Sequence, residues 1–159
     1  MSIPEIAREL GISYFLLKNE SWRLGLPAFK ILGASWATAR AVSKRLDIPI
    51  AANDAKESII QRLAGAATEA DITLYAATDG NHGRAVARMA KYLGIKARIY
   101  VPLMVDDETI GNIASEGAEV VVWQGDYDQT VNGTKETAAK HPDGKGLLIS
   151  DTALEVDEK

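Results

Sequence analysis

The clearest candidate for chemistry in this 159-residue sequence is a turn that combines two glycines with polar side chains. It spans Thr78 to Gly83, reads TDGNHG, and follows the apolar run Ile72–Ala77. Glycine allows a tight turn and a close approach of the backbone to a ligand, and a helix that starts here points its N–H groups at that ligand. Asp79 adds a carboxylate and Asn81 an amide. The alternative is a plain helix entry with Asp79 or Asn81 as the N-cap, because a Gly-x-x-Gly pattern alone is weak evidence.

Lys30 is the second candidate, and Asp151 is the third. Lys30 follows the apolar residues 26–29 at the start of a helical pattern. A lysine that loses part of its hydration favours the neutral amine, which can form an imine with an aldehyde. Composition alone favours the alternative, a solvated lysine on an amphipathic helix. Asp151 lies in the polar segment Ser150–Thr152, which follows the apolar run Leu147–Ile149.

Short apolar runs alternate with helical patterns along the chain, and this alternation predicts the elements that hold these residues. The predicted strands are Tyr14–Leu17, Ile72–Ala77, Ala97–Val101, Glu119–Trp123 and Leu147–Ile149. The predicted helices are 3–10, 30–46, 58–70, 84–93, 106–115 and 126–140. Continuous apolar strands between helices indicate an α/β fold, a parallel sheet flanked by helices. Ligands bind outside the carboxyl ends of such strands, where the polar segments fall.

Composition excludes several other kinds of protein. A net charge of −4 disfavours nucleic-acid binding, and the absence of cysteine removes thiolate metal sites and disulfides. With only His82 and His141 as histidines, we expect no metal site. No apolar stretch is long enough for a membrane helix, and the first residues do not resemble a signal peptide. We therefore expect a cytoplasmic protein without a membrane or nucleic-acid partner.

Taken together, the two main motifs resemble one family. Residues 26–34, LPAFKILGA, resemble the lysine segment of fold-type II pyridoxal-phosphate (PLP) enzymes, the tryptophan-synthase-β-like group, whose usual form is Ser-Phe-Lys-x-Arg-Gly-Ala. Residues 78–83 resemble that group's Ser-x-Gly-Asn-His-Ala turn. The resemblance runs from about Tyr14 to Thr152 and is specific because both motifs occur in the family's order.

Within the group, the diaminopropionate ammonia-lyases resemble this sequence most. They share Leu-Pro-Ala-Phe-Lys before the helix, an aspartate at position 79 and Ser-Asp-Thr-Ala at 150–153. The resemblance implies PLP as cofactor and an amino-acid substrate, 2,3-diaminopropionate, converted by α,β-elimination to pyruvate and ammonia. It implies that Lys30 forms the Schiff base with PLP and that Asn81 bonds to the ring hydroxyl oxygen. As a hypothesis, Lys30 and Asp79 act as bases on opposite faces, while Asp151 binds the β-ammonium or assists proton transfer.

The sequence departs from this family because it has no glycine-rich run of the kind that holds the PLP phosphate. We therefore expect residues 1–159 to be one α/β region matching the N-terminal part of such an enzyme, and its activity to be incomplete in this fragment. On this view, residues 1–50 hold the lysine strand and helix, and 51–159 hold most of the small domain. The alternatives are a related serine/threonine dehydratase-type lyase, a non-catalytic remnant that forms a homodimer or pairs with a full-length homologue, and a small nucleotide- or phosphate-binding module. The last needs a glycine-rich loop after the first strand, where 14–30 contain only Gly25.

Overall fold

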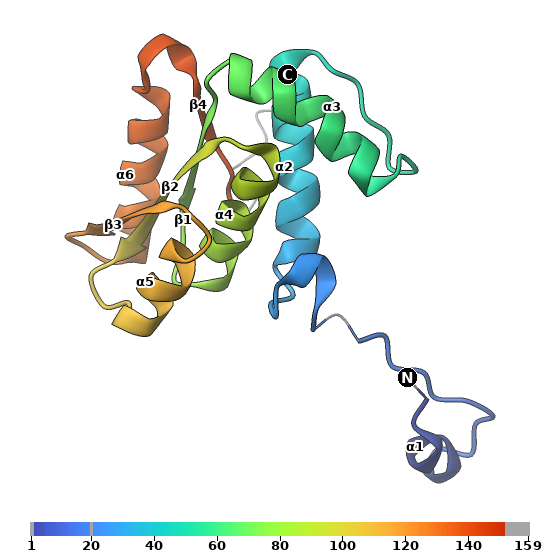
Figure 1. The fold of residues 1–159 in the computed structure, drawn as a ribbon. Coiled ribbons are helices and arrows are strands. Elements are labelled where there is room, and N and C mark those ends of the chain that lie inside the picture. Colours follow the sequence, from blue (N-terminus) through green and yellow to red (C-terminus); the bar gives the residue numbers. More distant parts are fainter. Residues whose placement is uncertain (1, 20, 152–159) are drawn as a thin grey trace, which may run out of the picture.

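The computed structural model describes residues 2–19 and 21–151 (Figure 1). Its helices are α1 Pro4–Glu9, α2 Ile31–Leu46, α3 Lys56–Glu69, α4 Asn81–Leu93, α5 Asp107–Ala114 and α6 Tyr127–Ala139, with short 3₁₀ turns at Arg23–Gly25 and Pro142–Gly144. The strands are β1 Thr73–Ala77, β2 Lys96–Pro102, β3 Glu119–Trp123 and β4 Gly146–Leu148. The predicted α/β class is confirmed.

The strands form one parallel sheet in the order β3-β2-β1-β4. The chain runs from β1 through β2 to β3 toward one edge, and then crosses to place β4 on the other side of β1. Tyr75 of β1 pairs with Arg98 of β2 and with Leu148 of β4. The carboxyl ends of β1 and β4 therefore lie side by side, at the point where the chain reverses its direction across the sheet. Ligands bind at such points in open α/β sheets.

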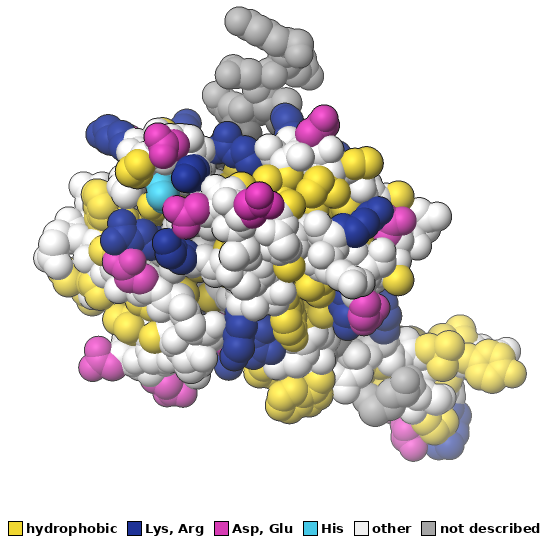
Figure 2. Space-filling model, turned by 45° about the horizontal axis from the view of Figure 1, so that its top comes forward, with side chains coloured by type: hydrophobic (Ala, Val, Ile, Leu, Met, Phe, Trp, Pro, Cys, Tyr) yellow, Lys and Arg dark blue, Asp and Glu magenta, His cyan; other side chains and the backbone are white. Residues whose placement is uncertain are grey.

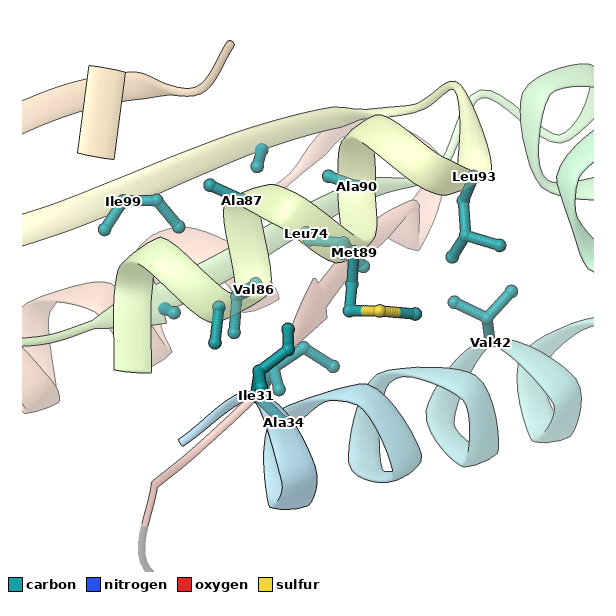
Figure 3. Close-up of a cluster of buried hydrophobic side chains, with 14 of the residues drawn as sticks. Ile31, Ala34, Val42, Leu74, Val86, Ala87, Met89, Ala90, Leu93 and Ile99 are labelled. Carbon is teal, nitrogen blue, oxygen red and sulfur yellow. The ribbon is translucent and has the colours of Figure 1, made fainter. Parts of the chain in front are cut away.

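Helices cover both faces of the sheet. Helix α6 packs on one face, α4 packs on the other, and α2 and α3 pack on the outer side of α4 (Figure 1). In Figure 3, Val86, Met89 and Leu93 of α4 extend toward Ile31 and Val42 of α2. Because α4 lies between the sheet and these helices, the side chains that it turns toward them are apolar and buried, among them Val86, Met89 and Leu93. The first residues of α2 and α4 are thereby held together at one end of the molecule.

Local signals in the sequence define several helix ends. Asp126 accepts a hydrogen bond from the Gln129 amide, and the Gln129 side chain accepts one from the Asp126 amide, which makes a capping box at the start of α6. Asp106 caps α5 in the same way through the Thr109 amide. Gly94, with φ +66°, ends α4 in the left-handed conformation that glycine adopts without strain. Both caps stand at the residues where the sequence predicts these helices to begin, 106 and 126.

The prediction of a buried strand at Tyr14–Leu17 is wrong. The side chains of Tyr14 and Leu16 are 77% and 74% exposed, and the strand pairing of this segment within residues 2–19 and 21–151 is an isolated antiparallel bridge, from Leu16 to Ser2. Residues 2–19 form an arm that extends away from the sheet (Figure 1), with apolar side chains on its surface (Figure 2). Periodicity does not reveal whether an apolar run has a neighbouring strand to pair with, and residues 14–17 pair with none of the four strands of this sheet.

The surface shown in Figure 2 carries acidic and basic side chains interspersed over the body of the molecule. Within residues 2–19 and 21–151, no helix is both long enough and apolar enough to cross a membrane.

Candidate functional site

The candidate residues of the sequence converge on one cavity at the carboxyl ends of β1 and β4. The cavity has a volume of about 440 Å³ and is lined by Lys30, Asp79, Asn81 and Asp151, together with Gly80, His82, Arg84, Thr109, Asn112, Ile113 and Tyr127. Lys30 comes from the residue before α2, Asp79 and Asn81 from the junction of β1 with α4, and Asp151 from the segment after β4. The sequence therefore identified side chains that the fold brings together from three separate segments.

Lys30 and Asp151 form an ion pair across 121 positions of sequence. The Lys30 Nζ lies 2.6 Å from both Oδ1 and Oδ2 of Asp151. The side chains are 32% and 26% exposed, so this pair is open to the cavity rather than buried. The Phe29 ring lies 5.7 Å from the amine on another side. The apolar setting expected for Lys30 is thus present on one side only, and a carboxylate faces the amine directly.

The turn between β1 and α4 is built around the Thr78 hydroxyl. The buried Thr78 Oγ1 accepts hydrogen bonds from the amides of Gly80 at 2.9 Å and Gly83 at 3.1 Å. Helix α4 begins at Asn81, three residues before the predicted start at Arg84. Thr78 satisfies an amide of the first turn that would otherwise lack a partner, and this bond allows the earlier start. Asn81, His82 and Gly83 therefore belong to the first helical turn.

The alternative interpretation of this turn, with Asp79 or Asn81 as the N-cap, is wrong. The N-cap residue is Gly80, and no side chain of the cap itself closes the helix. The side chains of Asp79 and Asn81 line the cavity instead of bonding to the helix end.

Gly83 is required for a different reason, which is close packing. A Cβ atom at this position would lie 2.3 Å from Thr78 Cγ2 and 2.5 Å from Ile99 Cγ2, distances that side-chain atoms do not reach. The glycine lets the first turn of α4 lie directly on β2. This contact sets the height of His82 and Asn81 above the sheet.

Tyr127 is a site residue that the sequence reasoning missed. It is the first residue of α6 and lines the cavity with Asp79 and Asp151. Burial raises the pKa of the Tyr127 hydroxyl above its ordinary value, and the negative charges of Asp151 and Asp79 raise it further. The rule that led to the other candidates also applies here, because Tyr127 follows the carboxyl end of β3.

Arg84 is a second missed residue, and it connects the cavity to a buried charge cluster. Its Nε donates to Oε1 of Glu116 at 3.1 Å, and Arg88 donates to both oxygens of the same carboxylate at 2.6 and 2.9 Å. Arg88 also donates to the carbonyls of Leu24 and Gly25, just before the Lys30 segment. Although burial raises the pKa of Glu116, the hydrogen bonds from Arg88 and Arg84 outweigh it, and the net pKa lies below its ordinary value.

His82 belongs to the lining of the cavity but is almost completely buried. Its side chain is 5% exposed, its Nε2 is 2.8 Å from the Ile149 carbonyl oxygen, and its Nδ1 is 3.7 Å from Asp151 Oδ1. His141 is only partly exposed because its ring packs edge-on against Tyr75. In the part of the chain that the structure describes, no group of three or more His, Cys, Asp or Glu side chains is arranged to hold a metal ion.

Curated proteins similar to this chain share one description. The diaminopropionate ammonia-lyase of Escherichia coli strain K12 is 35% identical over 154 residues, which are 97% of this chain and 36% of the relative. That of Salmonella typhimurium is 34% identical over 153 residues, again 36% of the relative. The chain thus spans about a third of the length of the curated relatives that it matches.

Solved structures give the same result. Diaminopropionate ammonia lyase from Escherichia coli in its apo form matches with a TM-score of 0.76 and 34% identity, covering 98% of this chain and 40% of that one. The same enzyme in complex with D-serine matches with a TM-score of 0.78 and 35% identity, covering 98% and 37%. Threonine deaminase isoform 2 from Solanum lycopersicum, at 21% identity and a TM-score of 0.64 over 94% of this chain and 33% of that one, shows the fold alone.

The family model described as "Pyridoxal-phosphate dependent enzyme" matches residues 1–155. This match covers both sequence motifs and the whole described sheet, so it excludes the small nucleotide- or phosphate-binding module as an interpretation. It also confirms the fold-type II resemblance and PLP as the family's cofactor. The chain belongs to the pyridoxal-phosphate dependent enzyme family.

Proposed function

We propose that this chain carries the cofactor-anchoring lysine of a lyase that eliminates ammonia from 2,3-diaminopropionate. The observation that carries the proposal is the convergence of Lys30, Asp79, Asn81 and Asp151 on one cavity. Relatives at 35% and 34% identity are named for this reaction. In this proposal, residues 1–50 supply the lysine and its helix, 51–159 supply most of the small domain of a cytoplasmic enzyme, and the remaining functional parts come from beyond the matched third of the relatives.

The residues present fit the reactive side of PLP. Lys30 offers a partly exposed primary amine to the cavity, and a primary amine is the group that an aldehyde cofactor attaches to. Asn81 lies in the same cavity, where its amide can donate to the ring hydroxyl oxygen. When bound, PLP supplies an electron sink for the carbanion that forms after loss of the Cα proton.

The protein side chains then divide the proton transfers. The Lys30 amine, once released by the amine of the substrate, takes or returns a proton at Cα on its own face. Asp79 acts at Cα from the opposite face, so the pair can serve either enantiomer. Asp151 binds the β-ammonium of the substrate after leaving Lys30, or assists its departure as ammonia. Addition of water to the enamine product then gives pyruvate and a second ammonia.

Trapping the cofactor on its lysine tests the proposal without requiring turnover. The chain is mixed with PLP, reduced with borohydride and digested, and the mass of the Lys30 peptide is measured. We expect the added mass on Lys30 and its loss in Lys30→Ala. Labelling that is spread over surface lysines and unchanged in Lys30→Ala would refute the anchoring role.

Pyruvate release distinguishes the substrates and the alternatives. We expect pyruvate from 2,3-diaminopropionate in a chain that includes the remaining two thirds of the relatives, with loss of turnover of one enantiomer in Asp79→Asn. Turnover of serine or threonine but not of diaminopropionate would favour a dehydratase-type lyase. If PLP is trapped on Lys30 but pyruvate is released only after a full-length homologue is added, the result would favour a chain that acts as a subunit partner.

A further inference from the structure

His82 lies against the Lys30–Asp151 pair, but the proposed reaction assigns it no role. Its side chain is 5% exposed and reaches from the first turn of α4 to the segment that follows β4. Its Nε2 is 2.8 Å from the carbonyl oxygen of Ile149. A carbonyl oxygen only accepts hydrogen bonds, so Nε2 carries a proton and donates it.

This bond determines the state of the other ring nitrogen. In a neutral imidazole with a proton on Nε2, Nδ1 has a lone pair. Nδ1 faces Oδ1 of Asp151 at 3.7 Å, which is too long for a hydrogen bond. His82 therefore does not hold the Asp151 side chain directly. His82 acts on Asp151 through the backbone carbonyl of Ile149, two residues earlier in the chain.

Ile149 is the backbone anchor. Its side chain is buried, its amide donates to the Tyr75 carbonyl at 2.8 Å, and its own carbonyl accepts from His82. The first bond continues the pairing of β4 with β1 by one residue beyond the strand. The second joins that extension to α4. These two bonds fix Ile149 at both its amide and its carbonyl, and Asp151 follows after a single intervening residue.

We infer that His82 is a positioning residue that holds the Ile149 carbonyl so that the Asp151 carboxylate closes on the Lys30 amine. Without this bond, the buried carbonyl has no donor from α4 and the segment after β4 is tied to the sheet alone. The Lys30–Asp151 contact then opens more often. The inference rests on the proposed function only in giving Lys30 a cofactor to anchor, and its tests need neither cofactor nor substrate.

The tautomer of His82 is the first test, and it needs no substitution at the site. The chain has two histidines, so a protein labelled with ¹⁵N-histidine gives two rings, and His141→Gln identifies the remaining one as His82. We expect the proton of the neutral His82 ring on Nε2. A neutral ring with its proton on Nδ1 would overturn the inference, whatever the outcome of PLP trapping.

The reactivity of the Lys30 amine is the second test. Trace acetylation with acetic anhydride, read by mass spectrometry, gives the labelling rate of Lys30 relative to the exposed Lys140. An ammonium that donates to both carboxylate oxygens is a poor nucleophile, so Lys30 should label slowly in the parent chain. In His82→Leu we expect the Lys30 rate to rise about fivefold, the factor that corresponds to the loss of one hydrogen bond of ordinary net strength.

Three comparisons separate positioning from a general packing role. In His82→Gln the side-chain amide can still donate to the Ile149 carbonyl, so the slow labelling should return. Asp151→Asn should raise the rate by itself, and adding His82→Leu to it should raise the rate no further, because the two changes act on the same contact. An equal further rise in the double variant, or a folded His82→Gln that labels like His82→Leu, would overturn the inference. If circular dichroism shows that His82→Leu does not fold, the tautomer and His82→Gln still decide it.

Discussion

Substitution of Glu116 by glutamine tests whether the buried charge cluster stabilises the wall of the candidate site. Glu116 is 3% exposed and accepts hydrogen bonds from Arg84 and Arg88. Glutamine keeps the shape and one acceptor oxygen but removes the charge that two guanidinium groups share. Removal of one partner of a buried ion pair costs about 3–5 kcal/mol. We take the lower end, about 3 kcal/mol, because Arg88 keeps its bonds to the carbonyls of Leu24 and Gly25.

The effect should depend on pH in a defined direction. The pKa of Glu116 in the folded chain lies below its ordinary value of 4.5. A carboxyl group whose pKa is lower in the folded chain than in the unfolded chain stabilises the folded state. This stabilisation is fully present above the pKa of the unfolded chain and is lost as the pH falls through the pKa of the folded chain. The difference in the free energy of unfolding between the parent and Glu116→Gln should therefore be largest near neutral pH. It should shrink as the pH falls below 4.5.

Urea denaturation at a series of pH values measures this gap, and thermal melts give an independent reading. A loss of 3 kcal/mol should lower the melting temperature by roughly 6–12 °C in a chain of this length. Glu136→Gln is the matched control, because Glu136 is 70% exposed and its pair with Lys140 at 3.4 Å is a helical i,i+4 contact. Such a contact contributes at most about 0.5 kcal/mol. A gap for Glu116→Gln as small as that of the control, or one that widens in acid, would refute the reasoning.

Two further substitutions test the packing and the caps that position the site. Gly83→Ala should cost about 1–3 kcal/mol in urea denaturation because its new Cβ overlaps Thr78 and Ile99, whereas Gly111→Ala, where a Cβ meets nothing within 4 Å, should gain up to about 1 kcal/mol from helix propensity. Equal effects of the two would show that α4 does not lie as close to β2 as described. Asp126→Ala should cost about 1 kcal/mol by removing the capping box of α6, and an unchanged urea midpoint would contradict that assignment.

The sequence predicted the sheet and its helices well because their signals are local. The apolar run at Glu119–Trp123 became β3 with the same limits, and the helix predicted from residue 126 begins there, with Asp126 as its N-cap. These features depend on neighbouring residues only. The start of α4 was predicted three residues late because Gly80 and Gly83 were taken as turn residues, while the Thr78 hydroxyl makes a helical turn possible there.

The contacts between distant segments could not be predicted in the same way. The sequence identified both Lys30 and Asp151, but it contains no signal that the two side chains meet, since they are separated by 121 positions. The apolar run at Tyr14–Leu17 failed for a related reason, because its burial depends on a partner strand that periodicity does not reveal. Tyr127 and Arg84 were missed because the search considered polar residues directly after strands and not the first turns of the following helices.

The geometry of the site depends on how α2 packs against α4, because each helix carries one half of it. Lys30 directly precedes α2, whereas Asn81 and His82 are in the first turn of α4. The two helices are held in register by apolar contacts along their length, from Ile31 beside the cavity-lining Lys30 to Val42 (Figure 3). A core substitution in this interface should therefore move Lys30 relative to Asp151 without touching either. The sheet adds a constraint, because the position of Asp151 depends on the pairing of β4 with β1 through Tyr75. The Lys30–Asp151 contact thus depends on both the helical layer and the edge strand, and under the proposed function an aldehyde cofactor would compete with Asp151 for the Lys30 amine.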